Sequence, residues 1–204
     1  MRALVIETAS EACSVALFED GRLLAHRHEV LGRGHAERLV PMIAELPGRG
    51  EAQDVRVSLG PGSFTGVRIG LAVARALAIA WGAQVRGYPT LRLLAAMGRQ
   101  RWAAPLTVCV NGGHGQWFVQ NFDAGGRAEG ELASLSPEEA RAGRHHGFAI
   151  GNRARELLAG AEGAHEALDR LPDARQWVLL DEAAHLDGLA PLYGRPPDAR
   201  LPAA

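Results

Sequence analysis

The stretch that decides the fold is residues 60–81, with the sequence GPGSFTGVRIGLAVARALAIAW. Its first four residues cannot continue a strand or a helix without strain, because glycine adopts positive φ freely and Pro61 fixes φ and lacks an N–H donor. Ser63 or Thr65 can then cap a helix by accepting a hydrogen bond from its first turn. Apolar residues dominate from Gly66 onward, without a proline, so the pattern predicts a turn followed by a long helix that ends near Trp81.

Small residues recur at every fourth position of this predicted helix and form one ridge along it. The ridge consists of Gly66, Gly70, Ala74, Ala78 and Gly82. A glycine inside a helix costs roughly 1 kcal/mol relative to alanine, so the ridge indicates that another backbone comes close. Spacing alone leaves two alternatives open, namely packing on the chain's own sheet or an interface with a helix of a partner. Two arginines, Arg68 and Arg75, and an apolar length below ~18 residues argue against a transmembrane span.

The first hundred residues predict one lobe of mixed secondary structure. Apolar runs at 3–6, 13–18 and 23–30 predict three meandering strands, and amphipathic spacing predicts a helix over 35–46, in which Pro41 marks either a start or a kink. Strands at 55–59 and 84–88 then flank the long helix, and another helix begins near 91. This order, β-β-β-α-β-α-β-α, predicts a mixed sheet flanked by helices.

The second half predicts a weaker copy of the same pattern. Strands are expected at 106–110, 116–122, 131–135 and 148–151, with a capping-box helix start at Ser136 and a helix over 153–159. We therefore divide the chain into an N-terminal lobe (1–103), a degraded second lobe (104–190) and a proline-rich tail (191–204) that we expect to be mobile.

Composition indicates an ordinary globular protein. The 204 residues are 47% hydrophobic and 22% charged, with a net charge of −1 and with arginine as the only basic residue besides histidine. This charge argues against a chain that grips nucleic acid mainly by neutralising phosphates. Cys13 and Cys109 lie in apolar strand-like runs and imply no disulfide framework. The run at 3–6 is too short for a signal peptide, so we expect a cytoplasmic protein without a membrane partner.

Two segments are candidates for holding a phosphate group. One is the turn 7–10, with Thr8 and Ser10, and the other is the start of the long helix, with Gly62, Ser63 and Thr65. The N-terminus of a helix is a natural anion site, although the lysine of a Walker motif is absent here. A structural turn is the competing interpretation of both segments.

Other catalytic constellations fail on spacing. The histidines form no H-E-x-x-H motif or helical pair, so we expect no metal site. A two-metal nuclease needs several carboxylates at strand ends, and only Glu7 is in such a place. The segment G-S-F-T-G differs from the G-x-S-x-G elbow of serine hydrolases. We therefore expect no catalytic residues.

Three segments, in order, resemble one family. Residues 6–17 (IETASEACSVAL), 35–42 (HAERLVPM) and 60–70 (GPGSFTGVRIG) are similar to the TsaB family, also called YeaZ, of bacterial tRNA threonylcarbamoyladenosine biosynthesis proteins. The third segment is highly specific, and the resemblance covers residues 1 to about 100 closely. Glu7 stands where the family often has Asp, Asn111 begins a turn where the family usually shows Asp-Ala-Arg, and residues 191–195 only approximate the family's P-x-Y-L-R ending.

The resemblance implies an actin-like, ribonuclease-H-like ATPase fold with two duplicated lobes. It also implies a non-catalytic scaffold that pairs with the catalytic subunit TsaD, and with the ATPase TsaE, in forming N6-threonylcarbamoyladenosine at position 37 of tRNAs that read ANN codons. The chain lacks the paired metal histidines of TsaD. Contact with tRNA is expected only through the complex, and the isolated chain is expected to have no activity alone and to be able to form a homodimer.

On this hypothesis two helices form the partner interface. Its expected residues are His35, Arg38, Leu39, Met42, Gly66, Gly70, Ala74 and Ala78. No cofactor is expected to bind tightly, and ATP or ADP at a subunit interface is left open. The alternative is a self-sufficient actin-like ATPase or phosphotransferase that uses Thr8, Ser10 and residues 62–65 on phosphate. Asn111 disfavours this alternative, because an amide cannot serve as a metal-binding carboxylate.

Overall fold

The first sheet combines an antiparallel meander with parallel strands. The computed structural model describes residues 1–194 apart from 144, 162 and 164. β1 (Arg2–Glu7), β2 (Ala12–Glu19) and β3 (Arg22–Val30) pair antiparallel, and β4 (Asp54–Ser58) and β5 (Gln84–Tyr88) join β1 in parallel, which gives the order β3-β2-β1-β4-β5. The apolar run of β1 is therefore central and is buried on both faces.

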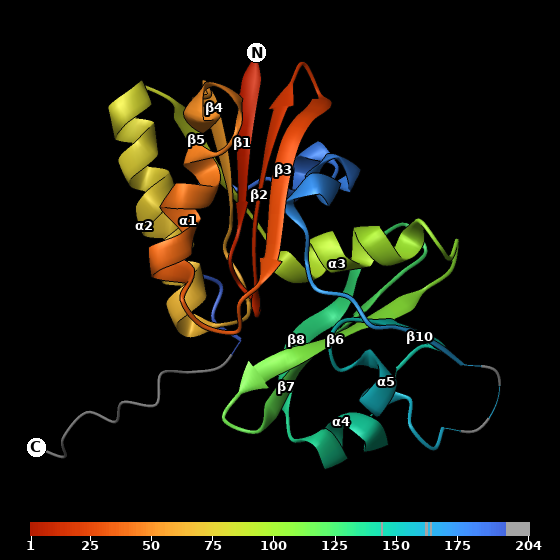
Figure 1. Cartoon of the computed structure of the whole chain (residues 1–204). Coiled ribbons are helices and arrows are strands. Elements are labelled where there is room, and N and C mark those ends of the chain that lie inside the picture. The colour runs from red at the N-terminus through yellow and green to blue at the C-terminus, as the bar shows by residue number, and fades with distance from the viewer. Residues whose placement is uncertain (144, 162, 164, 195–204) are drawn as a thin grey trace, which may run out of the picture.

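Two helices cover one face of this sheet. α1 (His35–Ala44) is followed by the short 3₁₀ helix η1 (Pro47–Gly50), and α2 (Phe64–Trp81) connects β4 to β5. Figure 1 shows α1 and α2 side by side against the strands. α1 begins at His35 and continues through Pro41, which settles the position of its start. Its buried residues Leu39, Met42 and Ile43 join the core formed with β1, β2 and β4.

The second sheet repeats the topology of the first. The order is β10-β9-β6-β7-β8, where β6 takes the place of β1, so the predicted duplication into two lobes of mixed sheet is confirmed. Its strands are β6 (Leu106–Gly113), β7 (Gln116–Phe122), β8 (Ala128–Leu135), β9 (Phe148–Ile150) and β10 (Glu166–Leu168). The three-residue β10 was not predicted, because its segment carries no run long enough to give a period.

The helices of the second lobe are short. α4 (Pro137–Ala142) and α5 (Ala154–Leu157) pack on β7 and β6. Ser136 and Glu139 form the predicted capping box at the start of α4. Both helices contribute to a second core around Cys109 and Trp117.

One helix and the C-terminal segment link the lobes. α3 (Thr90–Arg99) lies between the two sheets (Figure 1), with Leu91 and Leu94 in the core of the second lobe and Leu93 in a cluster on the first sheet. After β10 the chain returns to the first sheet through the 3₁₀ helices η2 (Ala174–Leu179) and η3 (Glu182–Ala184). The lobe boundaries at 103 and 190 stay a prediction, and residues 195–204 of the predicted tail lie outside the described residues.

Candidate functional site

A cleft of about 770 Å³ lies between the two lobes. The first lobe contributes the β1–β2 turn and the start of α2, and the second lobe contributes the end of β6 and the side chains of Phe118 and Asn152. Residues 191–194 form a further wall. The cleft therefore lies where the equivalent ends of both sheets meet.

The loop before α2 is held tightly on the β1–β2 turn. The Ser63 N–H donates to the Ala9 carbonyl at 2.7 Å, and a side chain at Gly62 would overlap the same carbonyl. The Ser63 hydroxyl accepts a hydrogen bond from the Gly66 N–H at 3.2 Å. Of the two predicted caps, Ser63 is therefore the one that the structure uses.

The predicted phosphate residues divide into two groups. Ser10, Gly62, Ser63 and Thr65 line the cleft. Thr8 does not: it is fully buried, and its hydroxyl donates to the Gly66 carbonyl at 2.8 Å. The assignment of Thr8 to a phosphate is thus wrong, because its hydroxyl is committed to joining β1 to α2.

Glu7 also lies below the surface of the cleft. It is fully buried at the end of β1, where Oε1 accepts from the Ala9 N–H at 2.8 Å and Oε2 has no hydrogen-bond partner. Burial raises the pKa of Glu7 to about 7. This carboxyl cannot act as an exposed metal ligand, and the described residues contain no group of three or more His, Cys, Asp or Glu placed to hold a metal ion.

Glu11 is a charged group that does face the cleft, and the sequence did not single it out. Its carboxylate accepts from the Asn152 side chain at 2.8 Å and from the Asn111 side chain at 3.4 Å. The Asn152 carbonyl in turn accepts from the Asn111 backbone N–H at 2.9 Å. The two Glu11 contacts join the β1–β2 turn to the second lobe across 100 and 141 positions in sequence, so no local pattern could have indicated them.

The first three residues of the small ridge of α2 pack on the chain's own sheet. Gly66, Gly70 and Ala74 are buried. A Cβ placed on Gly70 would lie 2.4 Å from the Thr8 hydroxyl oxygen and 3.5 Å from Val57, and one on Gly66 would overlap the Thr8 carbonyl. The space next to these three residues is therefore occupied by the chain's own sheet, and their assignment to a partner interface is wrong. Ala78 is half-buried.

Most of the interface residues predicted on α1 are also buried within the chain. Leu39 and Met42 are core residues. His35 is buried, with Nε2 3.2 Å from the Ala12 carbonyl oxygen. These side chains pack α1 on the sheet and do not face outward. The prediction that they contact a partner directly is therefore wrong as well.

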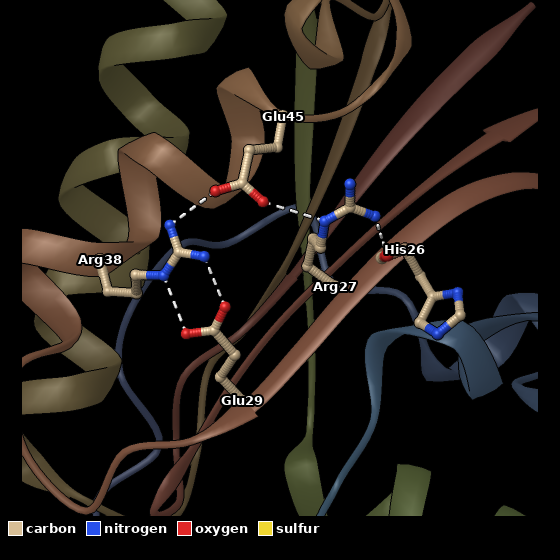
Figure 2. Close-up of polar contacts among 5 residues, drawn as sticks. All are labelled: His26, Arg27, Glu29, Arg38 and Glu45. Carbon is tan, nitrogen blue, oxygen red and sulfur yellow. Dashed lines mark hydrogen bonds and ion pairs between the residues drawn. The ribbon is translucent and has the colours of Figure 1, made fainter.

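Arg38 anchors α1 to the edge strand β3. Figure 2 shows its guanidinium between two carboxylates: Nε donates to Glu29 at 2.8 Å, and Nη1 donates to Glu45 at 2.7 Å. Glu45 also accepts from Arg27 of β3 at 3.0 Å. The hydrogen bonds from Arg38 lower the pKa of both glutamates, so the network is charged at neutral pH.

The outward face of α1 and α2 is apolar. Val40 is 52% exposed and Ile79 is 85% exposed. The exposed residues between and around them on the two helices include Ala36, Ala44, Ala72, Ala76 and Ala80. We call this surface the helical face. Exposed apolar residues gathered on neighbouring helices of a globular protein are typical of an interaction site.

α2 is also apolar enough to be considered as a membrane span. It has 18 residues with a mean hydropathy of 1.4, and 28% of them are buried. By length and composition it could therefore cross a membrane, contrary to the expectation from the sequence. One such helix is weak evidence, because core helices meet the same criterion. The buried side of α2, including Val67 and Leu71, packs in the core of the first lobe.

The duplicated sheets and the cleft between them define a two-lobed α/β protein of the actin-like, ribonuclease-H-like class. The profile of the family TsaD, tRNA N6-adenosine threonylcarbamoyltransferase, matches residues 28–133. YeaZ from Pseudomonas aeruginosa superposes with a TM-score of 0.76 at 29% identity, over 94% of this chain and 99% of that one. A second Pseudomonas aeruginosa structure, of a protein with similarity to peptidase YEAZ, gives 0.70 at 30% identity, over 86% and 87%.

Several curated relatives carry the TsaB name. The Escherichia coli tRNA threonylcarbamoyladenosine biosynthesis protein TsaB is 36% identical over 148 residues, which are 68% of this chain and 64% of that protein. The Haemophilus influenzae protein of the same name is 39% identical over 97 residues, which are 45% of this chain and 40% of the relative. The matches thus span between two fifths and just under two thirds of these relatives. The chain belongs to the TsaB (YeaZ) family.

Proposed function

We propose that the chain is a non-catalytic subunit in the formation of N6-threonylcarbamoyladenosine at position 37 of tRNAs that read ANN codons. Its relatives are named for the biosynthesis of this nucleoside. In this proposal it acts by pairing with the catalytic subunit TsaD, and TsaE joins the same assembly in the cytoplasm. The observation that carries the pairing is the apolar helical face, which nothing in the chain covers among the described residues.

The helical face has the properties of an interface core. Most of its exposed residues are apolar, and they lie on two helices that pack on the sheet and that the Arg38 network ties to β3. The same face can pair with a second copy of this chain when TsaD is absent. With a net charge of −1, the chain is expected to meet tRNA only through the complex.

The pairing is tested by placing a charge on the helical face. Ala76→Glu and Ile79→Glu add a carboxylate at exposed positions, where the isolated chain tolerates it and an apolar interface does not. We expect each to weaken binding to TsaD at least about tenfold, which corresponds to 1.4 kcal/mol. Val178→Glu, at a 48% exposed position on η2, is the matched control. Wild-type affinity for TsaD in both face variants would refute the use of this face.

A second candidate function is ATP hydrolysis or phosphoryl transfer by the chain alone. The observation in its favour is the cleft, which Ser10, Gly62, Ser63 and Thr65 line at the start of α2. We favour the subunit hypothesis, with ATP or ADP held where subunits meet, because the residue expected to aid phosphate binding, Thr8, is buried. Hydrolysis of ATP by the purified chain, lost on Thr65→Ala, would favour the second candidate instead.

A further inference from the structure

The segment Leu189–Gly194, which we call the strap, continues from η3 on the first sheet and ends in the cleft. It follows a bridge at which Gly87 and Leu186 exchange two backbone hydrogen bonds of 2.8 Å, so its start is fixed to the first sheet. Its last four residues, 191–194, line the cleft. A part of the chain remote in sequence from the loop before α2 thus forms one wall of the same cavity.

Backbone groups of the strap bind the first lobe at two points. The Arg75 guanidinium on α2 donates to the Leu189 carbonyl at 2.8 Å. Further along, the Leu192 N–H donates to the carbonyl of Leu59, just after β4, at 2.8 Å. Because both partners belong to the elements that hold the loop before α2, the strap is bound to the rim of the cleft rather than lying loosely across it.

Tyr193 adds an aromatic contact at the first turn of α2. Its hydroxyl accepts from Arg68 at 3.0 Å, and its ring centre is 6.0 Å from that of Phe64. The Arg68 guanidinium lies 3.6 Å from the centre of the Phe64 ring. The three side chains form one stack at the mouth of the cleft, although Tyr193 is 53% exposed and Phe64 57%.

The strap reaches the second lobe at its last described residue. Gly194 lies so close to the ring of Phe118, on β7, that an added Cβ would overlap the ring. The strap is therefore attached to the first lobe at Leu192 and Tyr193 and rests on the second lobe at Gly194. Its attachments are few and lie near solvent, which is typical of segments that open locally without global unfolding.

We propose that the strap is a latch: while it is attached to both lobes it holds the walls of the cleft together, and its release lets the lobes move apart. The tyrosine supplies the releasable contact, and the glycine permits the close approach to Phe118. The latch acts on the arrangement of the lobes within one chain, so it does not depend on the proposed partner.

Two variants of the full-length chain release the latch from opposite ends. Tyr193→Ala removes the stack on the first lobe, and Gly194→Val forces the strap away from Phe118. Spin labels on Arg22→Cys and Glu138→Cys, both exposed and on different lobes, report the distance between lobes, and hydrogen exchange reports on residues 60–67 and 110–118 at the cleft. Val178→Ala, exposed on η2 away from the cleft, is the control.

We expect both variants to lengthen and broaden the distance distribution and to speed exchange at the two cleft segments roughly tenfold, as loss of about one hydrogen bond's stabilisation implies. The control should leave both readouts at wild-type values. If either variant leaves both the distance and the cleft exchange unchanged, even while the strap itself exchanges faster, the strap is only a surface segment and the proposal fails.

Discussion

The contact between Gly70 and Thr8 can be tested by a double-mutant cycle. The Thr8 hydroxyl donates to the Gly66 carbonyl and occupies the space beside Gly70. Gly70→Ala would put a Cβ 2.4 Å from that oxygen, about 1 Å inside ordinary contact. In the Thr8→Ala background the nearest remaining atoms are on Val57 and Ile6, at 3.5 and 3.7 Å, which is ordinary packing.

These distances set the expected free energies of unfolding. Overpacking costs about 1–3 kcal/mol, loss of the Thr8 hydrogen bond about 1 kcal/mol more, and alanine returns about 1 kcal/mol of helix propensity. Gly70→Ala should therefore destabilise the otherwise wild-type chain by about 1–3 kcal/mol. In the Thr8→Ala background it should be neutral or stabilise by up to about 1 kcal/mol. The coupling energy between the two positions is then about 2 kcal/mol.

Urea unfolding of the four proteins measures this coupling. Ala72→Ser, at an exposed position of the same helix, is the control and should change stability by less than about 0.5 kcal/mol. A coupling below about 0.5 kcal/mol would refute the packing argument. Normal stability of Gly70→Ala together with loss of partner binding would instead revive the interpretation of the ridge as a partner interface.

Three further predictions concern buried titratable groups and the Arg38 network. Burial raises the pKa of Glu7 from 4.5 to about 7, so the folded chain holds this proton more tightly than the unfolded chain, and stability should fall as the pH rises from 4.5 to 7. Glu7→Gln should remove up to about 3 kcal/mol of that fall, measured by urea unfolding at both ends of the window, and equal slopes would contradict the assignment. Arg38→Gln should lower the melting temperature by an amount that shrinks in about 1 M NaCl, since the Arg38 network is near solvent; a salt-independent loss would point to packing instead. Burial raises the pKa of the Cys13 thiol to about 11 and that of Cys109 to about 12, so iodoacetamide at pH 8 should label neither until the chain unfolds, and rapid labelling of the native chain would show that they are accessible.

Much of the fold follows from local pattern. Alternation and turn residues predicted the meander at the start of each lobe, and the Gly60–Ser63 break predicted the start of α2, because each signal lies within a few residues of its effect. The failures lie where the cause is distant in sequence. The return of η2 and η3 to the first sheet, and the contact of Glu11 with Asn152, depend on segments brought together only by the completed fold.

The candidate site was harder to predict for the same reason. Periodicity placed the small residues of α2 on one face but could not say what that face meets, and only the Thr8 contact decides it. The hydroxyl-rich turn 7–10 suggested phosphate binding at Thr8, but the Thr8 hydroxyl donates to the Gly66 carbonyl inside the chain. Spacing therefore locates a surface, and the neighbouring segments determine its role.

The buried small residues of α2 and its exposed apolar residues are related through the space between the helix and the sheet. Because Gly66, Gly70 and Ala74 bring the helix backbone close to β1 and β4, there is room beneath it for few large side chains. The remaining apolar residues must then lie on the flanks or outward, and Ile79 at 85% exposure is the extreme case. Gly66, Gly70 and Ala74 pack inside the chain, and the outer surface of α2 carries Ala72, Ala76, Ile79 and Ala80. A composition that first suggested a partner at the ridge thus places the candidate partner surface on the opposite side of the same helix.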